Sequence, residues 1–111
     1  MDENSSAALK AGARITVFCS RLDEDFISTY APLALQAEAR ARAAPGFVSF
    51  KTFVAADGER LSLVVFATPE DHEAWRSDPF HLELQRQGRE SFYEEYEILV
   101  CELLAARTHR R

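Results

Sequence analysis

The feature that most constrains the fold is the order in which strand-like apolar runs alternate with stretches of apolar residues at helical spacing. Strands are predicted by runs of β-branched and aromatic residues at 14–22, 47–54, 61–67 and 98–104. Two stretches between these runs, one over 23–44 and one that opens at Thr68, repeat apolar residues at helical spacing. This order predicts an α+β, ferredoxin-like βαββαβ fold with both helices on one face of a four-stranded antiparallel sheet.

Short local signals mark the ends of these segments. Asp23 can cap the first helix, and Pro45-Gly46 is a breaker pair at its end. Asp57-Gly58 is a strong hairpin signal between the second and third strands. Thr68-Pro69 opens the second helix, and Ser77-Asp78-Pro79 repeats the same pattern, so that helix is expected to break and restart.

Apolar residues occupy both odd and even positions of the predicted strands, so both faces of the sheet would be apolar. Val17 and Phe18 are neighbours in the first strand, and Leu63 and Val64 are neighbours in the third. An antiparallel sheet with one solvated face would alternate apolar and polar residues instead. Because helices cover only one face, we expect a second copy of the chain to cover the other, giving a homodimer through the sheet faces.

Length and charge exclude several classes of protein. The 111 residues suit one domain, predicted at 13–104 between a disordered tail at 1–12 and a basic tail at 105–111. The net charge of −5 argues against nucleic acid as a partner. No apolar run is long enough to span a membrane, and the acidic start is unlike a secretory signal. We therefore expect a cytoplasmic protein that binds neither nucleic acid nor membrane.

No motif for a metal, a phosphate group or a nucleophile is present. His72-Glu73 begins like the helix of a zinc protease, but Arg76 stands where the second His is required. The glycines form no phosphate-binding loop, so no cofactor and no metal site are predicted. Cys19 and Cys101 lie in apolar runs and are expected to be free, buried thiols.

An aromatic set around the broken helix and the last strand remains. It consists of Trp75, Phe80, His81, Phe92, Tyr93 and Tyr96. These side chains fit either a helix-to-sheet core or the wall of a ligand pocket. His81 lies near the start of the restarted helix, where the helix dipole favours the neutral imidazole that accepts a proton. A plain surface histidine is the alternative for this residue.

These residues resemble the antibiotic biosynthesis monooxygenase (ABM) domains, over about residues 14–104. The resemblance rests on five segments in the same order: 15–18, 44–50, 57–58, 74–81 and 92–100. It implies a dimeric α/β barrel in which the two sheets face each other. It also implies a cavity near the broken second helix, used by cofactor-independent oxygenases for electron-rich aromatic polyketides or quinols.

A branch with the same fold that degrades haem is a poorer match. It uses an Asn near the end of the first strand, where this chain has Cys19-Ser20-Arg21. Trp75 is present, but Leu84 or Gln85 occupies the position of the His that follows it.

The sequence is therefore compatible with two functions. The first is a monooxygenase for a small aromatic or quinol-like substrate, and the alternative is a non-catalytic homodimeric domain that binds a small hydrophobic ligand. In the first, His81 is the candidate base and Trp75 a pocket wall. The residues expected to contact the substrate are Tyr93, Tyr96, Phe18, Phe50 and Phe80.

Overall fold

The computed structural model describes residues 9–111, so most of the predicted N-terminal tail, residues 1–8, lies outside the described residues. The strands are β1 (Arg14–Leu22), β2 (Phe47–Val54), β3 (Arg60–Phe66) and β4 (Tyr93–Glu102). The helices are α2 (Ile27–Ala43), α3 (Pro69–Arg76) and α4 (Pro79–Gln87). A short 3-10 turn, η1 (Glu24–Phe26), precedes α2, and a π-helical turn, η2 (Gly88–Phe92), follows α4.

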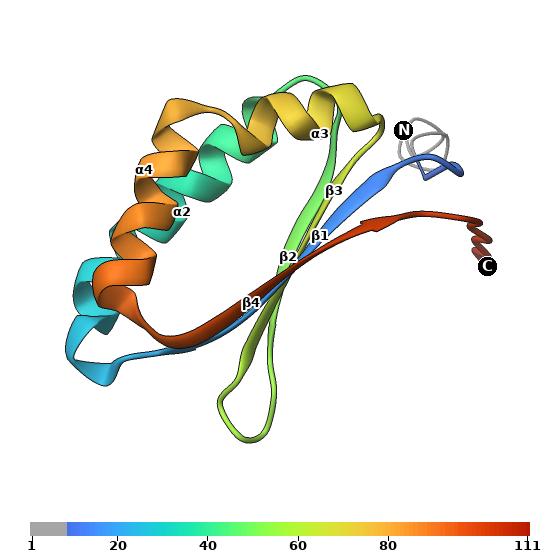
Figure 1. The fold of residues 1–111 in the computed structure, drawn as a ribbon. Helices are drawn as coiled ribbons and strands as arrows, with labels where there is room; N and C mark the ends of the chain where they lie inside the picture. The colour runs from blue at the N-terminus through green and yellow to red at the C-terminus, as the bar shows by residue number, and fades with distance from the viewer. Residues whose placement is uncertain (1–8) are drawn as a thin grey trace.

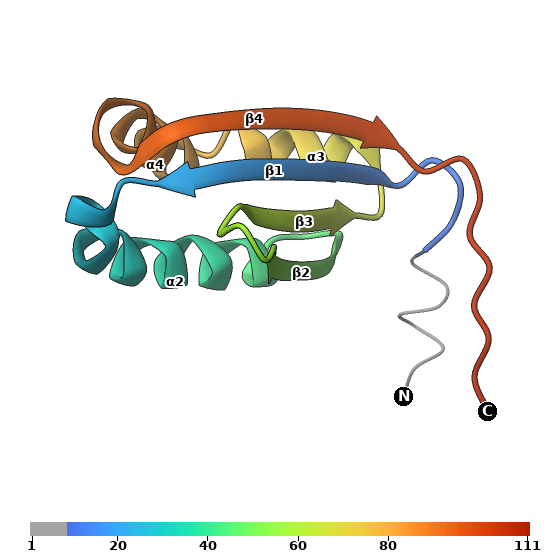
Figure 2. The same cartoon turned by 90° about the horizontal axis from the view of Figure 1, so that it is seen from below.

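The four strands form one antiparallel sheet in the order β2-β3-β1-β4. All the helices lie on one face of this sheet, and the other face carries no helix (Figure 1). Seen from below, α2 runs beside the β2 edge while α3 and α4 lie behind β1 and β4 (Figure 2). The predicted ferredoxin-like α+β fold is therefore confirmed.

The predicted caps place the helices in the chain. The side-chain oxygen of Thr68 accepts a hydrogen bond from the amide of Asp71 at 3.1 Å, and Asp78 accepts one from the amide of His81 at 3.2 Å. Gly46 follows α2 with a positive φ of 78°, a conformation that favours glycine. Each cap satisfies backbone donors that a helix start leaves without partners, so the second helix breaks where expected.

The fourth strand begins five residues earlier than the sequence predicts. It starts at Tyr93 and ends at Glu102, where the hydrophobic pattern alone gives 98–104. Its acidic first half forms a ladder with β1, in which Arg21 lies opposite Glu95 and the two side chains approach to 3.5 Å. Charged side chains suit an edge strand, which is why the run of glutamates does not end the pairing.

The core lies between the sheet and the helices. Phe66 of β3 is fully buried, and it packs with Val64, with Ala41 of α2 and with Trp75 of α3. Burying a side chain of this size contributes about 2 kcal/mol. The core therefore anchors Trp75 between α3 and the sheet.

Most residues in the middle of the sheet on the face without helices are apolar. Residues that pair across antiparallel strands share a face, so the β1 register groups Ile15, Val17 and Cys19 with their partners. The apolar partners are Leu61, Leu63, Val65, Leu99 and Cys101. Cys19 and Cys101 are free thiols, but the expectation that both are buried is wrong, because Cys101 is exposed in the single chain.

Residues 103–111 form neither helix nor strand. This C-terminal segment runs away from the sheet (Figure 2). Within residues 9–111, no helix has the length and apolar character needed to cross a membrane.

Candidate functional site

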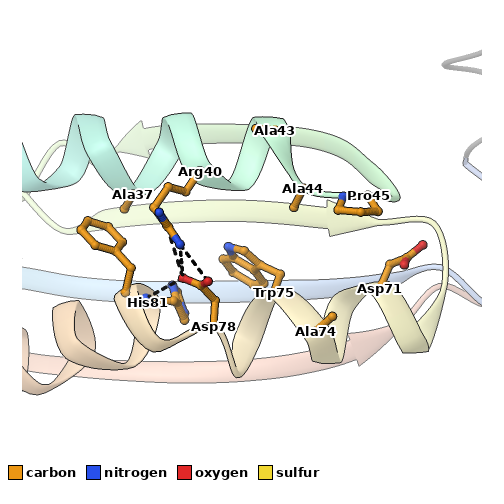
Figure 3. Close-up of a pocket in the computed structure, with 11 residues that line it drawn as sticks. Ala37, Arg40, Ala43, Ala44, Pro45, Asp71, Ala74, Trp75, Asp78 and His81 are labelled. Carbon is orange, nitrogen blue, oxygen red and sulfur yellow. Dashed lines mark hydrogen bonds and ion pairs between the residues drawn. The ribbon is translucent and has the colours of Figure 1, made fainter.

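A pocket of about 350 Å³ lies between α2 on one side and α3 with α4 on the other (Figure 3). Small side chains line the α2 side: Ala37, Ala43, Ala44 and Pro45. Aromatic rings from the broken helix line the opposite side: Trp75, Phe80 and His81. The volume lies at the small end of the range for ligand pockets, so it suits a compact ligand.

Trp75 forms the wall of this pocket. Its side chain is only 8% exposed and stacks on Phe66, with the ring centroids 5.2 Å apart and the planes at 24°. The indole also contacts His81, at 4.5 Å between centroids. The break between α3 and α4 produces this contact, because the restart at Pro79 brings the first turn of α4 back toward Trp75.

His81 has the properties of a neutral imidazole. Burial lowers its pKa below the ordinary value of 6.5, against the opposing charge of Asp78. The side-chain amide of Gln85 lies 3.3 Å from Nε2 of His81; when Nε2 carries the ring proton and donates to this amide, Nδ1 of the neutral ring is the atom that accepts a proton. At neutral pH such a ring can accept a proton from a group bound beside it.

An ion pair joins the two sides of the pocket. Nη2 of Arg40, on α2, lies 2.8 Å and 3.0 Å from the two carboxylate oxygens of Asp78. The guanidinium also lies over the ring of Phe80, with Cζ 4.8 Å from the ring centroid. Arg40 holds the pKa of Asp78 below its usual value, so both members of the pair stay charged.

A second histidine lies behind the pocket. His72 is 3% exposed, and its Nε2 is 2.7 Å from the hydroxyl of Thr16 on β1. Its ring contacts both Phe66 and Trp75, at 6.1 Å and 5.8 Å between centroids. His72 therefore joins α3 to the sheet next to the tryptophan.

The predicted site residues divide between three places. Trp75, Phe80 and His81 line the pocket, whereas Phe50 packs against the core on the sheet side. The other three, Phe18, Tyr93 and Tyr96, are not among the lining residues. They contact one another, with centroid distances of 5.2 to 5.9 Å.

These three rings extend into a second aromatic cluster at the start of α2. Tyr30 contacts both Phe92 and Tyr93, at 5.8 Å and 5.7 Å. Burial, together with the neighbouring Tyr30, raises the pKa of Tyr93. The Tyr93 hydroxyl therefore stays protonated, and its ring serves packing in this arrangement.

Within residues 9–111, no group of three or more His, Cys, Asp or Glu side chains is arranged to hold a metal ion.

Solved structures show which known proteins have this architecture. No family model matches the sequence, and no curated protein matches it significantly. Rv0793 from Mycobacterium tuberculosis superposes with a TM-score of 0.76 and 18% identity, covering 87% of this chain and 100% of that chain. A candidate antibiotic biosynthesis monooxygenase from Nitrosomonas europaea gives a TM-score of 0.71 and 13% identity, covering 84% of this chain and 91% of that chain.

A third solved structure, described as an antibiotic biosynthesis monooxygenase, gives a TM-score of 0.68 and 10% identity over 79% of this chain and 95% of that chain. The chain has the antibiotic biosynthesis monooxygenase (ABM) type of fold. The expected resemblance is confirmed at the level of the fold. At these identities the likeness does not extend to substrates, and the pocket itself must indicate them.

Sequence reasoning missed several residues of the pocket in this ABM-type fold. Arg40 and Asp78 are 38 positions apart, and nothing local in the sequence links them. The sequence marks Asp78 only as a helix cap. One signal could have indicated the pocket: α2 presents alanines toward a helix that carries Trp75, and small residues opposite a large aromatic leave space.

Proposed function

We propose that this protein is a cofactor-independent monooxygenase that oxidises a small aromatic or quinol-like substrate. The contact between Trp75 and the neutral His81 at 4.5 Å, on the wall of a pocket of about 350 Å³, carries this proposal. The indole supplies a flat apolar surface for an aromatic ring, and the imidazole supplies a base beside it. The shared fold with ABM-type proteins supports it further.

The chemistry requires little from the protein. His81 takes a proton from the substrate hydroxyl, and the electron pair of the broken O–H bond stays on the oxygen. The resulting phenolate passes one electron to O₂, and the two radicals combine at carbon. The peroxide anion takes the proton back from His81, and loss of water together with the hydrogen on the same carbon leaves a new C=O group, so one oxygen atom enters the product and the other leaves in water. The pocket holds the ring and limits access of water.

We further propose that a second copy of the chain covers the open face of the sheet. That face is apolar along β3 and where Ile15 and Val17 of β1 pair with Cys101 and Leu99 of β4, and Leu99 remains 44% exposed in the single chain. Two sheets can pack face to face with interdigitated apolar side chains. A second copy fits because the two partners then present the same apolar surface, as a two-fold interface requires.

Oxygen consumption tests the catalytic proposal. The purified protein is given a panel of hydroquinones and anthrones, with an oxygen electrode and product mass as readouts. We expect turnover by the natural chain and a loss of about 100-fold in His81→Ala, the usual contribution of a positioned base. Trp75→Phe should mainly weaken substrate binding, because it shortens the pocket wall.

His109→Ala is the matched control, since His109 lies in the exposed C-terminal segment. It should leave turnover unchanged. If both His81→Ala and Trp75→Phe retain full turnover, these roles are wrong. If a ligand binds saturably but is recovered unchanged and no oxygen is consumed, the protein is the non-catalytic binding domain instead.

A further inference from the structure

Arg40 is the only cation among the residues that line the described pocket, and part of its guanidinium makes no hydrogen bond within the described residues. Its Nη2 and Nε atoms serve Asp78, at 2.8 Å and 3.3 Å for the shortest contact of each. Among the described residues, Nη1 has no hydrogen-bond partner. The face of the guanidinium rests on Phe80, so the group is held in place before any ligand arrives.

The two ends of the pocket differ in charge. Arg40, Asp78 and His81 lie together at one end, and Asp71 lies at the other, with Trp75 between them (Figure 3). A negative group on a ligand would be repelled at the Asp71 end. At the opposite end it meets a guanidinium with unused donors. The charge distribution therefore orients an acidic aromatic ligand along the Trp75 wall.

We propose that Arg40 determines the specificity of this pocket by selecting aromatic ligands that carry an ionised oxygen. The oxygen binds Nη1, the part of the guanidinium that Asp78 leaves free. This inference rests on the proposed function for its choice of an aromatic ligand. In the proposed reaction, Arg40 receives the negative charge that forms on the substrate oxygen when His81 removes the proton.

Asp78 limits how much of the positive charge of Arg40 is available to a bound anion. Its carboxylate neutralises the guanidinium and also caps α4 through the amide of His81 at 3.2 Å. Asparagine caps a helix about as well as aspartate but carries no charge. Asp78→Asn should therefore keep the first turn of α4 in place while leaving Arg40 more available to an anion. A purely structural ion pair offers no such gain.

The test compares two probes with similar ring systems. 2-Hydroxy-1,4-naphthoquinone is ionised at neutral pH, and its 2-methoxy ether is neutral. Dissociation constants are measured by calorimetry at pH 7.5 for the natural chain, Arg40→Gln, Asp78→Asn and Arg42→Gln. Arg42 is the matched control: it lies on the same helix but bonds Glu38 and the carbonyl oxygen of Phe50, outside the pocket.

We expect the natural chain to bind the ionised probe more tightly than the ether. Arg40→Gln should weaken binding of the ionised probe about tenfold, the usual scale for a charge-assisted hydrogen bond, and leave the ether unaffected. Asp78→Asn should strengthen binding of the ionised probe severalfold. Arg42→Gln should change neither dissociation constant. Thermal unfolding of each variant checks that the fold is retained.

The inference is overturned if neither probe binds saturably, or if the natural chain binds both equally. It is equally overturned if Arg40→Gln and Asp78→Asn weaken binding together, or if Arg42→Gln reproduces the loss. These outcomes are separate from the proposed function: oxygen consumption without preference for an anion removes only the role of Arg40. Preference for the anion without oxygen consumption removes only the oxygenase.

Discussion

His72 shows how one residue connects the core to the pocket. Its ring lies between β1, where it bonds Thr16 at 2.7 Å, and Trp75 on its own helix. Burial is the main cause that lowers its pKa below 6.5, with a further contribution from Arg76 and a smaller opposing one from Glu73. The folded protein therefore holds this side chain in its neutral form at neutral pH.

This arrangement predicts that acid destabilises the fold. Because the pKa of His72 is lower in the folded chain, the unfolded chain binds the proton more readily as the pH falls below 6.5. The stabilising contribution is complete above that pH and is lost as the pH drops through the lower pKa of the folded state. Urea unfolding at pH 7.5 and 5.5, followed by Trp75 fluorescence, should show a smaller loss of stability in His72→Gln.

His109→Gln is the matched control for this measurement, because His109 is exposed in the C-terminal segment. It should retain the full pH dependence of the natural chain. An equal loss of stability in the natural chain and in His72→Gln would show that His72 does not cause it. The pKa of His81 is also lowered in the folded chain. The stability of the double variant His72→Gln/His81→Gln should therefore depend even less on pH.

At the scale of elements, the junction between α4 and β4 decides where the aromatic cluster lies. The π-helical turn η2 occupies residues 88–92 and ends directly at Tyr93. Gly88 in that turn is buried, and a Cβ atom added to it would lie 2.5 Å from the ring of Tyr93. The ring is enclosed on its other sides by Phe18 and Tyr30. Glycine is required here because Tyr93 packs directly against the backbone.

Gly88→Ala should therefore destabilise the protein, although alanine is the better helix former. The backbone at Gly88 is already helical, with φ at −60°, so only the collision with Tyr93 opposes the substitution. We expect a loss of about 1–3 kcal/mol in the free energy of unfolding, typical of overpacking. Denaturant unfolding measures it. Gln87→Ala, one position earlier, should be close to neutral, and Gly88→Ala should regain stability when Tyr93→Leu is added.

Most helices and strands can be predicted from the sequence because their ends depend on local interactions. Thr68 and Asp78 accept hydrogen bonds from residues three positions away, so these caps are visible in the sequence. The start of β4 could not be found in this way. Its glutamates look like a solvated run, and only pairing with β1, with Arg21 opposite Glu95, makes that segment a strand.

At the scale of the whole molecule, the open sheet face leads to a test of self-association. Leu99 lies on that face and is 44% exposed in the single chain, so Leu99→Glu costs a monomer little. In a face-to-face dimer the same carboxylate would be buried without a partner. Light scattering at micromolar concentration should give the mass of two chains for the natural protein and of one chain for Leu99→Glu.

Leu82→Glu is the control for this experiment. Leu82 is 49% exposed, close to the value for Leu99, but it lies on α4 on the helical side of the sheet. It should leave the mass at two chains. A mass of one chain for the natural protein would contradict the proposed homodimer directly.

The sequence by itself determined the order of the elements, the break in the second helix and the two-faced apolar sheet. These features depend on caps, turns and which positions of each strand are apolar, and all of these act over a few residues. Only the tertiary structure decided that Trp75 and His81 share a pocket while Tyr93 and Tyr96 pack elsewhere. The ion pair between Arg40 and Asp78 was equally beyond prediction. It depends on how closely α2 approaches the broken helix, which the packing of alanines against aromatic rings sets across distant parts of the chain.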